Sequence, residues 1–349
     1  MSETRFIPQS MRTEVTSPEV FNKRRAILKT LAVSMVPGVP GLCCGEISGN
    51  GQEGGQSFSP LESPLSWPEG MKRTVNQAFT IPEGLRSDLT PRLAAATHNN
   101  YYEFLFGGGG PVWKHTGKFV VDPWTVEVGG LCRKPLKLGL EDLFRFPHEE
   151  RLYHFRCVER WAMNVPWSGF PLRVLLEKVE PKPEAKFVRF VSAHRPEQMP
   201  GLKHPGAASH TWPYHEGLRI DEAMHEMAFV ATGVYGAPLL KQHGSPLRIV
   251  VPWKYGYKNP KSIVRIELVA EQPPTYWSRA PYQHEYGFLS NINPNIPHPR
   301  WSQKQSYWLD TREKFDTPVF NGYEKEVGGL YPDEPTTLQK PVQRGKKAR

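Results

Sequence analysis

Cys157 is the residue whose surroundings most suggest chemistry in this sequence. It lies in the stretch HFRCVERWAMNVPWSGFPL, directly after Arg156 and two residues before Glu159. A cysteine in such a setting serves as a nucleophile, a redox thiol, a metal ligand or a buried structural residue. Arg156 is expected to lower the pKa of the thiol, because a nearby cation stabilises the thiolate. That effect suits a nucleophile and a metal ligand equally, so the four roles stay open on these residues alone.

Other chemical motifs in the chain are incomplete. The glycine run at 107–110 lacks the Gly-Lys-Ser/Thr ending of a phosphate-binding loop, which argues against a nucleotide site. Two stretches begin like the zinc motif H-E-x-x-H, at His215 and His225, but neither has the second histidine. The chain has no C-x-x-C pair for a dithiol redox site. Cys132 and Cys157 are the cysteines beyond residue 45, and one disulfide between them stays open as an alternative.

The first 45 residues have the features of an export signal. Arg24 and Arg25 precede a short apolar run that contains Pro37 and Pro40. Paired arginines before such a run are typical of twin-arginine export, and the run is too short for a membrane span. We therefore expect residues 1–45 to be a removable twin-arginine signal peptide and the mature protein to be periplasmic. Because this route carries folded proteins, often with a cofactor already bound, it favours a prosthetic group in the mature protein.

The sequence around Cys157 and after it predicts a strand-rich α+β fold. The chain contains 35 prolines and 30 glycines, which predict many turns and short strands. β-Branched and aromatic residues predict strands at 124–130, 185–193, 245–253 and 261–272, and short helices are expected at 138–146, 170–181 and 219–227. In the helix at 170–181, one face is apolar and consists of Leu172, Leu175, Leu176 and Val179. We expect a linker or wrapping arm at 46–95, a catalytic domain at 96–325 and a C-terminal tail at 326–349.

The charge of the chain gives no reason to expect a nucleic-acid partner. The formal net charge is +9, but the first 45 residues hold six basic and three acidic residues, and RGKKAR at the C-terminus adds four basic ones. The body of the protein is therefore close to neutral, with about +2.

Several long stretches of the sequence resemble one family. The chain is similar to the catalytic molybdenum subunits of the periplasmic protein-methionine-sulfoxide reductases in RCVERWAMNVPWSGFPL, GSPLRIVVPWKYGYKNPKSI and EYGFLSNINPNIPHPRWSQ, in this order. The resemblance runs from Asn99 to Tyr323. It implies the molybdopterin-binding fold of the sulfite-oxidase superfamily.

The resemblance also implies a molybdenum–molybdopterin cofactor, with the Cys157 thiolate as the protein ligand of the metal. It implies cofactor contacts for nine further residues: Asn99, Tyr102, Glu103, Ser192, His243, Arg248, Asn259, Pro260 and Lys261. Arg248 and Lys261 would meet the phosphate, for which cations and backbone N–H groups are the usual partners. Three of the nine depart from the family pattern, which has Asn at 243, Thr at 192 and Gly at 259.

The reaction implied by the resemblance is oxygen-atom transfer from methionine sulfoxide residues of oxidised exported proteins, a form of protein repair. Glu159 would relay protons and Asn100 would orient the substrate oxygen. Trp161, Trp167 and Phe170 would keep water away from the metal ligand. The chain has no C-x-x-C-H haem motif, so the electrons would come from elsewhere. The resemblance implies that their source is a membrane haem-binding subunit that oxidises quinols.

Alternatives to this interpretation remain. Glu159 would form only a structural salt bridge if it paired with Arg156 or Arg160. A sulfite dehydrogenase of the same fold would have paired arginines shortly after the cysteine, where this chain has only Arg160. A non-enzymatic binding module would use the same fold as a scaffold and would contain no molybdenum.

Overall fold

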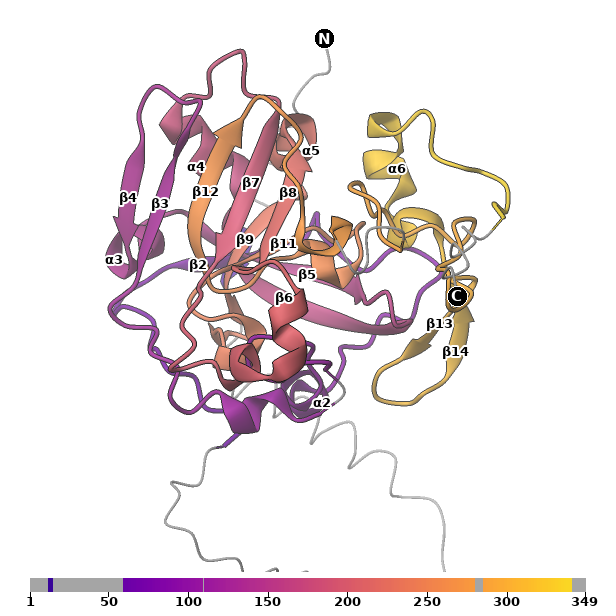
Figure 1. The fold of residues 1–349 in the computed structure, drawn as a ribbon, viewed down its shortest axis with the longest axis horizontal. Helices are drawn as coiled ribbons and strands as arrows, with labels where there is room; N and C mark the ends of the chain where they lie inside the picture. Colours follow the sequence, from indigo (N-terminus) through magenta and orange to yellow (C-terminus); the bar gives the residue numbers. More distant parts are fainter. Residues whose placement is uncertain (1–11, 15–58, 109, 280–284, 341–349) are drawn as a thin grey trace, which may run out of the picture.

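The computed structural model describes residues 12–14, 59–108, 110–279 and 285–340. The expected signal peptide at 1–45 lies outside these residues except for 12–14, and so does the basic end at 344–349. In the described part of the chain, two β-sheets with short helices between their strands form the fold (Figure 1). The predicted strand-rich α+β fold is confirmed. The expected domain boundaries stay a prediction.

The larger sheet carries the residues around Cys157. Its strand order is β1-β2-β5-β6-β13-β14, and β9 pairs with β6, β10 and β11. The strands are β1 (Arg12–Glu14), β2 (Arg73–Asn76), β5 (His148–Arg156), β6 (Trp161–Pro171), β9 (Phe229–Val234), β10 (Ala237–Pro238), β11 (Arg248–Val250), β13 (Gln305–Trp308) and β14 (Lys314–Asp316). β5 and β6 are antiparallel, and their last paired residues are Arg156 and Ala162. Cys157 therefore lies in the turn that joins them.

The smaller sheet contains three of the strands predicted from the sequence. Its order is β4-β3-β12-β7-β8, with β12 parallel to β3 and antiparallel to β7. The strands are β3 (Thr125–Gly130), β4 (Leu136–Gly139), β7 (Phe187–Ser192), β8 (His215–Arg219) and β12 (Ile263–Val269). β3, β7 and β12 confirm the predictions at 124–130, 185–193 and 261–272. In the larger sheet, β11 confirms the fourth, at 245–253.

The helices are short, as the proline and glycine content predicts. They are α2 (Arg92–Thr97), α3 (Leu140–Phe144), α4 (Leu172–Val179), α5 (Ile220–Met224) and α6 (Glu324–Val327). Short 3-10 turns include Val112–His115, Lys241–His243 and Gly256–Lys258. In α4 the apolar face predicted from the sequence is buried as a whole. This helix ends at Glu180, which adopts a left-handed conformation with φ 52°.

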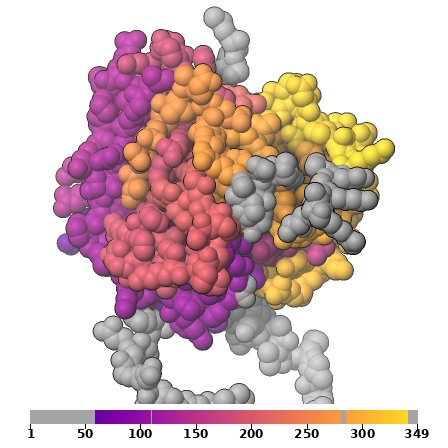
Figure 2. All heavy atoms as spheres, in the orientation of Figure 1, coloured from indigo at the N-terminus to yellow at the C-terminus, as the bar shows by residue number. Residues whose placement is uncertain are grey.

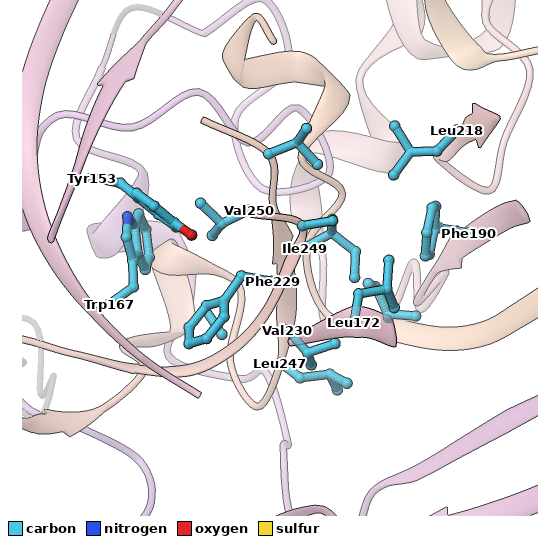
Figure 3. Close-up of a cluster of buried hydrophobic side chains, with 14 of the residues drawn as sticks. Tyr153, Trp167, Leu172, Phe190, Leu218, Phe229, Val230, Leu247, Ile249 and Val250 are labelled. Carbon is cyan, nitrogen blue, oxygen red and sulfur yellow. The ribbon is translucent and has the colours of Figure 1, made fainter. Parts of the chain in front are cut away.

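The core fills the space between the sheets and around β11. In Figure 3 the side chains of Ile249 and Val250 lie between Trp167 on one side and Phe190 on the other, so β11 is surrounded by apolar groups. Both β11 residues are 0% exposed. A strand buried on both sides is held firmly, and the residue at its start, Arg248, is held with it.

The segment 301–340 packs on the main domain as irregular turns with two short strands, β13 and β14, and the helix α6. In Figure 2 it appears in yellow beside the orange segment that precedes it. A buried polar network fixes it, because the Glu222 carboxylate accepts hydrogen bonds from Lys254 Nζ at 2.8 Å and from the Tyr331 hydroxyl at 2.7 Å. Among the described residues, no helix is both long enough and apolar enough to span a bilayer.

Candidate active site

A cavity of about 430 Å³ lies where three distant parts of the sequence meet. Cys157 reaches it from the β5–β6 turn, Asn100 from the stretch after α2, and Arg248 from the start of β11. Strand pairing accounts for this convergence, because β9 pairs with β6 on one edge and with β11 on the other. The larger sheet thus places the thiol and the buried arginine around one space.

Cys157 is held in place by the backbone of its turn. Its N–H donates to the Trp161 carbonyl at 3.0 Å, and the Arg160 N–H donates to the Cys157 carbonyl at 2.9 Å. Arg160 adopts φ 77°, a left-handed conformation that non-glycine residues rarely adopt and that often marks functional turns. Cys132 and Cys157 are both free thiols, so the alternative of a disulfide between them is not realised.

Burial dominates the protonation of Cys157. It raises the pKa of the thiol to about 12, and the charge of Glu159 adds to this rise. The backbone N–H of Glu159, the charge of Arg156 and the Asn100 side chain all lower the pKa, but they do not overcome burial. The expected effect of Arg156 is therefore right in direction and too small to decide the protonation state. A soft metal ion bound at the sulfur is what would keep this residue as a thiolate.

One carboxylate oxygen of Glu159 accepts two hydrogen bonds. Asn100 Nδ2 donates to Glu159 Oε2 at 2.9 Å, and Trp161 Nε1 donates to the same oxygen at 3.1 Å. Asn100 Nδ2 also lies 3.8 Å from Cys157 Sγ. The carboxylate is thus fixed beside the thiol by two neutral groups, which leaves its other oxygen for a further partner.

Arg156 does not pair with Glu159, so that part of the salt-bridge alternative is not supported. It is fully buried, and it donates to Ser306 Oγ and to Gln303 Oε1 at 2.7 Å each. It also donates to the Cys157 carbonyl at 3.3 Å. The guanidinium therefore ties the Cys157 turn to β13 and the segment before it.

Two buried cations, Arg248 and Lys261, line the same cavity. The Arg248 guanidinium donates to the carbonyls of His243 at 3.1 Å and Asn259 at 3.3 Å, and Lys261 Nζ donates to the Asn100 carbonyl at 3.0 Å. Within the described residues, neither cation forms an ion pair with a carboxylate. Burial lowers the pKa of Arg248 to about 10 and that of Lys261 to about 8. Uncompensated buried charges are costly, so an anion in the cavity would stabilise both.

The cavity wall also contains buried polar atoms without a hydrogen-bond partner. Among the described residues they are Asn99 Oδ1, His243 Nδ1 and Trp167 Nε1. Native proteins satisfy nearly all such atoms, so each indicates a group that a ligand would supply. Glu103 lies in the same wall, and burial raises the pKa of its carboxyl to about 7, while Lys261 opposes the rise. These residues fit a ligand with an anionic end and several hydrogen-bonding atoms.

The structure places nine of the twelve predicted site residues in the cavity wall. These are Asn99, Asn100, Tyr102, Glu103, Cys157, Glu159, His243, Arg248 and Lys261. Close packing brings two of them together at Gly244, which adopts φ 97° and where a Cβ atom would lie 2.6 Å from Lys261 Cβ. Glycine therefore allows the turn that carries His243 to pack on Lys261.

Three of the predicted site residues do not line the cavity. They are Ser192, Asn259 and Pro260, which are buried. The Asn259 side chain accepts from the Val251 N–H and donates to the Tyr255 carbonyl, so its polar atoms are used inside the protein. Its φ of −109° suits any residue, which explains how asparagine stands where the resembling family has glycine. The Ser192 hydroxyl is buried without a partner. Cofactor contacts of these three residues stay a prediction.

One aromatic residue predicted near the metal ligand lies elsewhere. Trp161 and Trp167 line the cavity, but Phe170 does not. It stacks on Phe146 with ring centroids 4.3 Å apart. Phe170 lies nine residues after Trp161 along one extended strand, and a strand of that length spans roughly 30 Å. Closeness in the sequence therefore did not mean closeness in space.

The sequence did not identify the aromatic side chains of the cavity that come from distant loops. They are Tyr214, Tyr257, Trp277, Tyr286 and Trp301. The Trp277 and Tyr286 rings lie 5.2 Å apart, and Tyr257 meets Tyr286 edge to face at 5.0 Å. The many aromatics in the proline-rich segment after residue 273 were the available signal, but loops give no periodicity from which to derive their direction.

Comparisons with known proteins give the relatives of this chain. Residues 114–277 match the family model described as the oxidoreductase molybdopterin binding domain. The chain is 40% identical over 331 residues to the protein-methionine-sulfoxide reductase catalytic subunit MsrP of Pseudomonas syringae pv. tomato, covering 92% of this chain and 94% of that protein. It is 40% identical over 328 residues to the protein of the same name from Xanthomonas axonopodis pv. citri, covering 91% and 94%. Among solved structures, the sulfane dehydrogenase SoxCD of Paracoccus pantotrophus is similar with 20% identity, a TM-score of 0.39 and coverage of 54% of this chain and 55% of that one.

Proposed function

The chain belongs to the family of protein-methionine-sulfoxide reductase catalytic subunits, and from this premise we propose that it reduces methionine sulfoxide residues in exported proteins. It is a molybdopterin oxidoreductase. The observation that carries the proposal is one cavity that holds a buried thiol, a fixed carboxylate and two buried cations: Cys157, Glu159, Arg248 and Lys261.

The residues present fit the cofactor that the family implies. Arg248 and Lys261 would bind its phosphate, and the unpartnered atoms of Asn99 and His243 would meet its polar edge. Cys157 would be the protein ligand of molybdenum, because a soft thiolate suits this metal. When bound, the cofactor supplies two-electron oxygen-atom chemistry, which converts a sulfoxide to a thioether.

The protein's own groups supply protons and orientation. Sulfoxide reduction consumes two electrons and two protons and releases water, so a proton carrier is needed beside the reacting oxygen. Glu159 Oε1 would take this role, which the binding of Asn100 and Trp161 to Oε2 supports. Asn100 lines the cavity beside Cys157 and would orient the sulfoxide oxygen through its amide.

The cavity suits a neutral sulfoxide better than anionic sulfite. Two arginines, Arg160 and Arg300, line it besides Arg248. Arg300 pairs with Glu285 at 2.9 Å, so its charge is largely compensated. The aromatic side chains around Trp277 and Tyr286 add apolar surface. Arg248 and Lys261 are assigned to the cofactor phosphate, so among the described residues of the cavity wall Arg160 is the remaining arginine that would favour sulfite.

We also propose the export route and the electron source. The paired arginines Arg24 and Arg25 support twin-arginine export to the periplasm. The relatives are named catalytic subunits, which supports a partner subunit. We propose that this partner is a membrane haem-binding protein that oxidises quinols and passes electrons to the cofactor.

Molybdenum content and paired activity assays test the proposal. Exported protein should contain one molybdenum per chain, should reduce methionine sulfoxide with a reduced dye, and should not oxidise sulfite. Sulfite oxidation without sulfoxide reduction would support the sulfite dehydrogenase instead. Folded protein that acquires no molybdenum would indicate a binding module.

Replacement of the thiol tests the assignment of the metal ligand. Cys157→Ser keeps the size of the side chain but removes the soft donor, so it should abolish sulfoxide reduction and change the metal spectrum. Cys132→Ser is the matched control, because Cys132 is buried outside the cavity wall. An unchanged molybdenum–sulfur shell and full activity in Cys157→Ser would show that the thiol is an ordinary core residue.

A further inference from the structure

A second cavity of about 430 Å³ adjoins the active-site cavity. Val158, Tyr257 and Tyr286 line both. Val158 directly follows Cys157, so the second cavity begins within one residue of the proposed metal ligand. Tyr286 packs against Trp277, which lines the first cavity, and against His298, which lines the second. The ring centroids are 5.2 Å apart in each pair. The two cavities are therefore neighbours that share one wall, formed by Val158, Tyr257 and Tyr286.

The wall of the second cavity contains apolar residues beside four charged ones, Arg219, Glu285, Asp333 and Glu334. Its lining includes Leu289 and Ile296, and Ile296 is 42% exposed. Leu338 is 55% exposed and belongs to the neighbouring segment, because the Gln339 N–H donates to the Asn295 carbonyl at 2.7 Å. Two of the most exposed large hydrophobic side chains in the described residues thus come from adjoining segments beside the active site. Grouped exposed apolar side chains mark binding surfaces.

We propose that the second cavity binds an apolar side chain of the polypeptide substrate, two residues away from the oxidised methionine. This inference rests on the proposed function. In an extended chain, side chains two residues apart point to the same side and lie roughly 7 Å apart. With the sulfoxide in the first cavity, such a side chain passes Tyr286 and reaches Leu289 and Ile296. The substrate is favoured over the electron-donating subunit as the occupant, because the residues shared by the two cavities make the second a continuation of the substrate site.

Synthetic peptides test the inference without any variant. The probes are N-acetylated pentapeptide amides with methionine sulfoxide at the centre and glycine elsewhere, compared with peptides that carry one leucine at the first or the last position. Free methionine sulfoxide is the baseline, and a reduced dye supplies electrons so that no partner protein is involved. One leucine peptide should show kcat/KM about tenfold higher than the glycine peptide, mainly through KM, which corresponds to about 1.4 kcal/mol.

A matched pair of surface variants then locates the effect. Ile296→Asp places a charge at the rim of the second cavity and should remove the leucine preference, with the kinetics of the glycine peptide unchanged. Val120→Asp is the control, because Val120 is exposed to a similar extent, 46%, and lines neither cavity. It should keep the preference.

The outcomes separate this inference from the proposed function. If methionine sulfoxide is reduced in none of these probes, free or in a peptide, both fail. If it is reduced but leucine and glycine peptides have equal kcat/KM, only the second site fails. Ile296→Asp that slows every substrate equally, or that impairs only reduction by the membrane electron donor, would also overturn the inference, and the latter result would assign the surface to the donor.

Discussion

Lys261→Met should change the cofactor-free and the cofactor-bound protein in opposite directions. Lys261 is buried against Arg248 and contacts the Asn100 carbonyl, and burial lowers its pKa from 10.5 to about 8. A folded-state pKa below the unfolded one means that the unfolded chain binds more protons, so the charged lysine destabilises the empty protein at neutral pH. A methionine of similar length removes the charge and keeps most of the packing.

The size of both effects follows from the structure. The lowered pKa of Lys261 corresponds to a cost of up to roughly 3 kcal/mol below pH 8, which is relieved as the pH rises from 8 to 10.5. The variant should therefore be as stable as the parent or more stable when empty, and the difference should shrink across that pH range. A charge-assisted hydrogen bond to phosphate contributes about 1.5–3 kcal/mol, so its loss should weaken cofactor binding by roughly 10- to 150-fold.

Lys258→Met is the matched control. Lys258 is equally buried, but it donates to Glu216 Oε2 at 2.7 Å in an ion pair and does not line the cavity. Removing one partner of a buried pair leaves an uncompensated charge and should cost about 3–5 kcal/mol. The control should therefore lose stability with and without cofactor, by a mechanism that Lys261→Met does not share.

Denaturant unfolding of cofactor-free protein at pH 7 and pH 10, together with molybdenum and pterin content, measures both effects. Full pterin content in Lys261→Met would refute the phosphate assignment. A loss of stability in the empty variant as large as that in Lys258→Met would show that Lys261 forms a structural pair, with Glu103 as its nearby acid.

The remaining predictions concern the Glu159 carboxylate beside the thiol and the buried His154. Glu159→Gln should lower kcat without changing molybdenum content. Turnover equal to that of the parent would make Glu159 structural. Trp161→Phe removes one of the two hydrogen-bond donors to Glu159. Because such a bond contributes about 1 kcal/mol, kcat should fall about fivefold with KM unchanged. An equal loss in kcat and in pterin content would contradict a positioning role. Burial lowers the pKa of His154 to about 4, so the unfolded chain binds more protons below pH 6.5 and stability should fall as the pH drops from 6.5 to 4. Unfolding of a His154→Gln variant at pH 7 and pH 4 should show a smaller loss than in the parent, and an equal loss would assign the acid sensitivity to other groups.

Local pattern was sufficient for four of the strands and for the apolar face of α4, but not for β5 and β6, which flank Cys157. The apolar spacing of α4 and the β-branched runs of β3, β7, β11 and β12 depend on neighbours within a few residues, so they could be predicted from the sequence. Cys157 stood out because a lone thiol between charged residues is chemically unusual. The resemblance of long stretches to one family then led to the cavity residues Asn100, Arg248 and Lys261.

The tertiary structure decided the properties that depend on distant partners. Burial, and not the adjacent Arg156, sets the pKa of Cys157, and burial is a sum over contacts from the whole fold. Glu159 binds Asn100 and Trp161, which no local motif indicates. The aromatic boundary with Tyr286, and the second cavity behind it, come from irregular loops. The sequence by itself determined which side chains are available and which elements carry them. Only the packing of those elements decided which side chains face one another, because protonation and contact depend on distance and solvent exclusion in three dimensions.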